Sequence, residues 1–257
     1  MATKLRIKGR MLLIGNTCLL HLILATGVML ILCVNFSVLT YELFLKKSNS
    51  RLADFSVSLL LLLLSAAVCW LMHLGTVRFF LRRSQGMGES AADLFRYFNP
   101  MRSPGALAFG VGLVAIKIFY FALSIIPFGI IFYILVSALH RGVSALVAAF
   151  LAVGCVLLFI SSVIFYKSIT ASLFLCKYHY VCGDCISFRQ IITSSFQDME
   201  KRKRLLMRLK GSFGGWFFLS LLILPSGYVW SYYNQTLAVA ASEFMGYEKN
   251  EADGYLQ

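Results

Sequence analysis

Long apolar runs with almost no charged side chains recur along this sequence and alternate with short polar segments. About 20 consecutive apolar residues are enough for one helical crossing of a lipid bilayer. Four runs meet that length, and they predict transmembrane spans at residues 11–34, 55–77, 105–127 and 143–166. Because backbone polar groups find no water inside hydrocarbon, we expect each span to be an α-helix.

The last apolar stretch, residues 211–242, is too long for one simple crossing. Pro225 and Gly227 lie near its middle, and a proline so close to a glycine favours a break. We therefore expect a fifth span at 205–224 and a sixth at 228–246. The alternative is five spans, with a tilted last segment that lies at the membrane interface.

The amino-acid composition agrees with a membrane protein. Of the 257 residues, 59% are hydrophobic and 14% are charged, against about 45–50% and about 25% in a soluble domain. A soluble globule of this size cannot bury so much apolar surface, and disorder requires low hydrophobicity. The sequence therefore predicts an all-α polytopic transmembrane helix bundle that forms a single integral membrane domain over residues 1–257.

The net charge of +13 is concentrated in three segments, which are residues 1–10, 78–102 and 189–210. The predicted spans place all three on the same side of the membrane. Basic residues accumulate on the cytoplasmic side of membrane proteins, so we expect a cytoplasmic N-terminus in a bacterial cell membrane. Anionic lipid headgroups are then the expected partner of the positive charge, and we expect no nucleic-acid partner.

Four basic residues precede the first apolar run, which is a pattern also seen in signal peptides. The apolar run of a secretory signal is only about 7–15 residues long, and a small-residue cleavage site follows it. Here the run is longer and no such site closes it, so we expect an uncleaved first helix.

Residues 187–204 predict an amphipathic helix between the fourth and fifth spans. Apolar side chains recur there at helical spacing and are followed by a basic cluster, which is typical of a helix lying in the headgroup layer. We expect anionic lipid headgroups to contact Lys201, Arg202, Lys203, Arg204 and Arg208. The alternatives are contact with a protein partner and an anchor that only sets topology.

A further pattern runs from the end of the fourth span to residue 246. Its characteristic positions are Ser187, Ser194, Ser195, Met199, Gly211, Ser212, Phe213, Gly214, Gly215, Trp216, Pro225, Gly227, Trp230, Tyr232, Thr236 and Phe244. Over about residues 166–246 the chain resembles a bacterial family of multi-spanning membrane proteins known as domain of unknown function 975. The stretch Ile126-Pro127-Phe128-Gly129 is similar to an earlier element of that family. The resemblance implies a bacterial plasma-membrane protein with about six spans, and it implies no activity.

Cys176, His179, Cys182 and Cys185 follow one another at three-residue intervals. Cysteine thiolates and neutral histidine are zinc ligands, and four of them complete a tetrahedral structural site. A continuous helix would separate the outer pair around its axis, whereas a turn at Gly183 would fold the last two cysteines back toward His179. Thiol redox chemistry is an alternative, and incidental thiols with no shared role are the interpretation we favour.

Lys117 is the one formal charge deep in an apolar run. Charges inside a membrane are costly and often functional, but a lysine near a helix end reaches the interface with its flexible stem. The long apolar run from Lys117 to Leu139 favours a position at the cytoplasmic interface. No acidic residue lies inside a span to pair with Lys117, which argues against a relay of protons or cations.

Other polar and small residues within the spans are typical of helix packing. Asn16, His21 and His73 are expected to form hydrogen bonds between helices. Small faces for close helix approach are expected at Gly105, Gly110, Gly112, Gly211, Gly214 and Gly215.

The sequence contains no phosphate-binding loop, H-E-x-x-H motif or G-x-S-x-G nucleophile motif. We therefore expect a non-enzymatic membrane factor, without a cofactor, that interacts with lipids, with other membrane proteins or with copies of itself. A transporter or permease component for small molecules, lipids or peptides is the alternative, because Pro127 and Pro225 predict interrupted helices.

Overall fold

The computed structural model describes residues 1–12, 34, 38, 51–87, 92–142, 144–183, 187–219 and 223–246, and no β-strand occurs among them. The all-α prediction is therefore confirmed. In chain order the helices are α1 (Ala2–Leu12), α3 (Arg51–Ser84), α4 (Ala92–Phe95), η1 (Arg96–Phe98), α5 (Ser103–His140), α6 (Ala145–Ser172), η2 (Leu173–Leu175), α7 (Cys176–Cys182), α8 (Phe188–Met199), α9 (Lys203–Gly211), α10 (Gly214–Leu219) and α11 (Ile223–Met245).

Three helical stretches are long and apolar enough to cross a membrane: Ser56–Ser84, Ser103–His140 and Leu146–Cys182. They correspond to the second, third and fourth predicted spans and agree with a transmembrane protein. The first predicted span, 11–34, lies almost entirely outside the described residues. The fifth and sixth are not among the three stretches.

α5 continues beyond the predicted end of the third span. It extends to His140 with Pro127 inside it, so the expected interruption at this proline is wrong. Proline removes one backbone hydrogen bond from a helix. Membrane helices tolerate that loss where a neighbouring helix packs alongside, and α6 packs along α5.

The predicted fifth and sixth spans also differ from the structure. Where the apolar pattern predicts one helix over 205–224, the described residues form two short helices, α9 and α10, separated at residues 212–213. α11 is described from Ile223 onward and includes Pro225. The predicted break at Pro225 and Gly227 is therefore wrong, because the helix continues through both.

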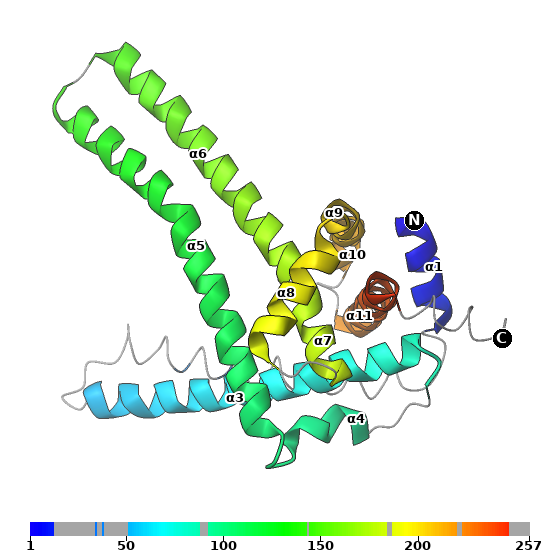
Figure 1. Cartoon of the computed structure of the whole chain (residues 1–257). Helices are drawn as coiled ribbons and strands as arrows, with labels where there is room; N and C mark the ends of the chain where they lie inside the picture. The colour runs from blue at the N-terminus through cyan, green and yellow to red at the C-terminus, as the bar shows by residue number, and fades with distance from the viewer. Residues whose placement is uncertain are drawn as a thin grey trace.

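α5 and α6 run side by side and project from the rest of the molecule (Figure 1). We call residues 118–139 of α5 and 146–166 of α6 the hairpin. Of its described side chains, only Ser124 and Cys155 are buried. The Ser124 hydroxyl donates to the Ser162 carbonyl at 2.6 Å and joins the two helices near the middle of their length. The rest of the hairpin presents apolar side chains to its surroundings.

The other helices form a body at the base of the hairpin (Figure 1). The body consists of α1, residues 71–84 of α3, α4, η1, the start of α5 up to Leu113, η2 and α7–α11. Its central helix is α11, in which every residue from 235 to 242 is buried. A helix that is buried all round is a core helix. The sixth predicted span, 228–246, is thus enclosed by protein over this length.

The basic N-terminal segment is a helix, α1, that packs against α11. Leu5 is buried, and Gly9 faces Thr236 so closely that a β-carbon on this glycine would lie 2.6 Å from the Thr236 Oγ1. The Tyr232 hydroxyl donates to the Arg6 carbonyl at 3.3 Å. The close approach of the two helices therefore depends on a glycine at position 9.

α3 joins the body to the base of the hairpin. A β-carbon on Gly75 would lie 2.0 Å from the Leu94 carbonyl oxygen, so α4 packs directly against the α3 backbone. The Trp70 Nε1 donates to the Ala106 carbonyl of α5 at 2.9 Å. The indole ring also lies against Gly110, where a β-carbon would be 2.4 Å from the ring nitrogen.

The expected small-residue contacts are present on α5 and missing near α10. Gly110 faces Trp70, and a β-carbon on Gly112 would lie 2.7 Å from the Phe188 ring. At Gly211, Gly214 and Gly215, by contrast, an added β-carbon would meet no described atom within 4 Å, so close packing at these three is not seen among the described residues.

The predicted amphipathic helix ends earlier than expected and faces the protein. Ser187 caps α8, since its hydroxyl accepts from the Gln190 backbone N–H at 3.3 Å. Ile191 and Met199, in the apolar stripe, are buried in the body. The helix ends at Met199 rather than at 204. The stripe therefore fills the protein core, because an apolar face gains as much from burial in protein as from burial in lipid.

Candidate functional site

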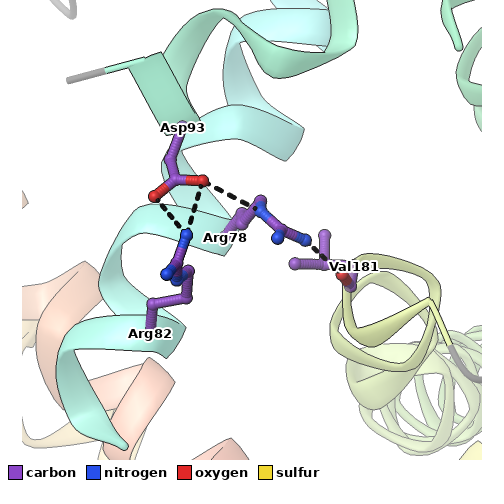
Figure 2. A network of polar contacts seen from close by, with 4 residues as sticks. All are labelled: Arg78, Arg82, Asp93 and Val181. Atoms are coloured by element: carbon purple, nitrogen blue, oxygen red, sulfur yellow. Dashed lines mark hydrogen bonds and ion pairs between the residues drawn. The ribbon is translucent and has the colours of Figure 1, made fainter. Parts of the chain in front are cut away.

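Asp93 lies between two arginines of α3 (Figure 2). The Arg78 Nε donates to the Asp93 Oδ1 at 3.1 Å, and the Arg82 Nη1 donates to both carboxylate oxygens at 3.1 and 2.9 Å. Asp93 is only 5% exposed, and charge-assisted hydrogen bonds are strong in such an environment. The carboxylate therefore joins α4 firmly to α3.

Arg78 also joins α3 to α7. Its Nη1 donates to the Val181 carbonyl at 3.0 Å (Figure 2). α7 ends at Cys182, and Gly183 follows with a φ of +78°. The last carbonyls of a helix lack partners within the helix and attract positive charge. The guanidinium thus stabilises the end of α7.

The surroundings of Asp93 contain more arginine than acid. Burial, followed by the charges of Arg78 and Arg102, lowers the pKa of Arg96. Burial raises the pKa of Tyr97, and the nearby Arg78 opposes that rise. Arginine does not give up its proton at neutral pH, so this cluster is suited to joining helices and to carrying positive charge.

The predicted lipid-contact residues lie at the junction of α8 and α9. Lys201, Arg204 and Arg208 are exposed and Lys203 is half-buried. None of these four has an acidic partner within the described part of the chain. Their contact with headgroups stays a prediction, and they remain accessible to make it.

Arg202, the fifth predicted contact, has a partner inside the protein. Its Nη1 donates to the Phe244 carbonyl in the last turn of α11, and its guanidinium lies 5.4 Å from the centre of the Phe244 ring. A basic group at the C-terminal end of a helix is stabilising. The structure thus gives Arg202 a role in holding α9 to α11.

The Cys/His cluster is only partly described, because Cys185 lies outside the described residues. Cys176 is buried, and His179 turns toward α8, where its Nε2 lies 3.1 Å from the Asp198 Oδ2. No group of three or more potential metal ligands occurs among the residues that the structure places. The four-residue zinc site stays a prediction.

The sequence interpretation missed the roles of Asp93, Lys177 and Lys210. The sequence interpretation counted Asp93 only in the net charge of residues 78–102. The basic side chains at the end of α3 were the available signal for its partners. Lys177 and Lys210 lie beyond the ends of apolar runs, where a lysine is expected in any membrane protein. Their proximity to Lys117 comes from the fold and has no local signal. Asn16 and His21 lie outside the described residues.

Comparison with known proteins identifies no relative. No family model matches the chain, and neither a curated protein nor a solved structure matches it. The resemblance to the family of unknown function over about residues 166–246 stays a prediction.

Proposed function

We propose that this protein is a non-enzymatic integral membrane factor. Its hairpin crosses the lipid bilayer, and its body lies at the cytoplasmic face and contacts anionic headgroups. The observation that carries the proposal is the exposure of apolar side chains on all sides of the hairpin, with only Ser124 and Cys155 buried among its described residues. Soluble proteins do not expose contiguous apolar surface of this extent.

The length of the hairpin supports the proposal. Its two uncharged segments, 118–139 and 146–166, each hold about 21 residues, which is roughly 32 Å of helix at ~1.5 Å per residue. The hydrocarbon core of a bilayer is about 30 Å thick. Lys117 and Lys167 stand at the body end of these segments, and Arg141 stands at the tip. Charged residues therefore bracket one membrane thickness at both ends.

The distribution of basic residues supports the orientation. α9 packs against α6 near the base of the hairpin, and the exposed side chains of Lys201, Arg204 and Arg208 belong to this region. Each basic residue near an anionic surface contributes on the order of 1 kcal/mol to membrane binding. The positive-inside tendency then assigns the body to the cytoplasm and Arg141 to the opposite side.

No observation favours the transporter alternative. That interpretation depended on helices interrupted at Pro127 and Pro225, and both α5 and α11 continue through these prolines. We therefore propose interaction with lipids, with other membrane proteins or with copies of the chain as the role.

Cysteine accessibility tests the orientation. On a background in which the native cysteines are alanine, Arg141→Cys and Lys201→Cys should react from opposite sides with a reagent that does not cross the membrane. Arg141→Cys should react in intact cells and Lys201→Cys only after the membrane is opened. Labelling of both from the same side would overturn the proposal.

A matched pair of substitutions tests insertion. Leu157 and Leu146 are both exposed on α6, but Leu157 lies near the middle of the hairpin and Leu146 near its tip. Arginine at the centre of a membrane helix costs about 2.5–3.5 kcal/mol. Leu157→Arg should therefore reduce the fraction that resists alkaline extraction from membranes, and Leu146→Arg should leave it unchanged. Equal resistance of the two variants would argue against a membrane-embedded hairpin.

A further inference from the structure

Two lysines lie beside one aromatic ring near the base of the hairpin, and a third, Lys117, is within electrostatic range of one of them. Lys117 belongs to α5, Lys177 to the first turn of α7 and Lys210 to the last turn of α9. The Nζ of Lys177 lies 5.9 Å from the centre of the Phe174 ring, and the Nζ of Lys210 lies 5.0 Å from the same centre. The two ammonium groups therefore share one aromatic neighbour.

His73 of α3 completes the group, which we call the lysine cluster together with Lys117, Lys177 and Lys210. The His73 Nε2 lies 3.4 Å from the Lys177 Nζ. The ring of Tyr178 covers the same ammonium at 5.3 Å from its centre. Nitrogen groups of α3, α7 and α9 thus lie close to the rings of Phe174 and Tyr178, with Lys117 of α5 in electrostatic range.

No carboxylate of the described residues balances this charge. None of the three lysines pairs with an acidic residue anywhere in the described ranges, although all three are half-buried. Burial, and then the positive charge of Lys117, lowers the pKa of Lys210. Elsewhere in the body the fold does supply an acid, since Asp93 lies between Arg78 and Arg82. The lysine cluster therefore has no acidic partner among the described residues.

Buried charge is stable when a partner of opposite sign is present. Lysine ammonium groups bind phosphate as point charges, and several can share one phosphate. Lys117 of the cluster stands where the uncharged part of α5 begins. At that level a phospholipid carries its phosphate, with its acyl chains beside the apolar hairpin.

We propose that Lys117, Lys177 and Lys210, with His73, form a binding site for a single phosphate group carried by an anionic lipid headgroup. The lipid as carrier rests on the proposed membrane function, whereas the phosphate site itself does not. A soluble phosphate ester would present the same chemistry, so the test includes both sources.

The test measures the affinity of the full chain, purified in a neutral detergent, for two probes. Phosphatidylglycerol is titrated and followed by native mass spectrometry, and glycerol phosphate is titrated by calorimetry. The double variant Lys177→Gln/Lys210→Gln should bind phosphatidylglycerol at least tenfold more weakly. The matched variant Lys4→Gln/Arg10→Gln removes two exposed basic residues of α1 that lie outside the cluster and outside the predicted headgroup contacts. It should stay within twofold of the wild type.

Each outcome has a defined meaning. Binding of phosphatidylglycerol alone supports a lipid source, and equal binding of glycerol phosphate supports the site with a soluble ligand. Unchanged affinity in the cluster variant, or an equal loss in both variants, overturns the proposal. Membrane labelling of Arg141→Cys and Lys201→Cys from one side would overturn the membrane function without affecting glycerol phosphate binding.

A measurement on the wild type keeps the test valid if the cluster variant does not fold. Saturating phosphatidylglycerol should protect Lys177 and Lys210 from acetylation at least fivefold, while the exposed Lys4 continues to react. If the lipid left the acetylation of Lys177 and Lys210 unchanged, the site would also be overturned.

Discussion

Gln235 and Thr236 in the body are fully enclosed, whereas Phe150 and Leu157 in the hairpin are largely exposed. Both regions are apolar, but the body buries its helices against one another, with backbone contact at Gly75 and a carboxylate between arginines. In the hairpin, α5 and α6 pack mainly against each other. The apolar side chains of the body are therefore suited to burial in protein, and those of the hairpin are suited to contact with lipid.

The largest expected effect removes the acid that joins the body. Asp93→Asn leaves Arg78 and Arg82 without a charged partner, and loss of one member of a buried ion pair costs about 3 kcal/mol. We expect a loss of that size in the free energy of unfolding, measured by denaturant titration in detergent micelles. Asp198→Asn, at a more exposed pair, should cost about 1 kcal/mol or less. Equal losses in the free energy of unfolding for the two variants would contradict the difference in burial between the Asp93 and Asp198 pairs.

A pair of glycines compares the body with the hairpin directly. Gly75→Ala places a methyl group against the Leu94 carbonyl, and overpacking of this kind costs about 2 kcal/mol. The added methyl group of Gly154→Ala in the hairpin meets no described atom within 4 Å, and alanine is the better helix former by about 1 kcal/mol. Thermal unfolding should show a lower midpoint for the first variant and an unchanged or higher one for the second. A lower midpoint for Gly154→Ala would mean that α6 packs tightly against a partner.

Replacing Gln235 should have a smaller effect on the free energy of unfolding, and it should stabilise the protein. The side-chain amide is fully buried in α11, and neither its nitrogen nor its oxygen has a hydrogen-bond partner among the described residues. An unsatisfied buried polar group costs about 1–3 kcal/mol. Gln235→Met, which nearly conserves volume, should therefore raise the free energy of unfolding by about 1 kcal/mol. A marked destabilisation would show that the amide has an essential partner in the functional state.

The smallest effect concerns pH and again separates the two regions, since the hairpin contains no lysine. Burial lowers the pKa of Lys210 below the value of about 10.4 for a free lysine. The unfolded chain then holds this proton more tightly, so stability should rise with pH between the folded pKa and about 10.4. The free energies of unfolding of the wild type and of Lys210→Gln can be measured at several alkaline pH values. The value for the wild type should rise with pH relative to that for the variant. If the free energy of unfolding of the wild type did not rise relative to that of the variant, the assigned burial of Lys210 would be contradicted.

The helices of the hairpin could be predicted because their signal is local. Each side chain faces the same kind of surroundings, so uncharged runs such as 146–166 are sufficient to locate them. The apolar stripe of α8 is different, since Ile191 and Met199 would be equally apolar against lipid or against protein. Sequence periodicity identifies such a face without identifying what covers it.

Residues far apart in the chain were the least predictable. Lys177 and Lys210 lie beside the same ring, that of Phe174, only because of the fold, and no spacing in the sequence encodes that. Arg202 was grouped with its basic neighbours, but the position of α11 gives it a separate partner in Phe244. Pro225 alone is compatible with two arrangements. A helix can start close to this proline, because proline is tolerated in a first turn, or a helix can end before it, because proline disrupts a helix interior.

The bonds made by Arg78 also imply an order of events during biosynthesis. Asp93 follows Arg78 closely in the chain, so the α3–α4 pair closes a short loop at little entropic cost while translation continues. Val181 is synthesised only after both helices of the hairpin. The same guanidinium therefore makes an early bond and a late one, and the late bond exists only in chains whose α5 and α6 have been completed. A nascent chain that stalls before α7 would lack it and present an open body to membrane proteases.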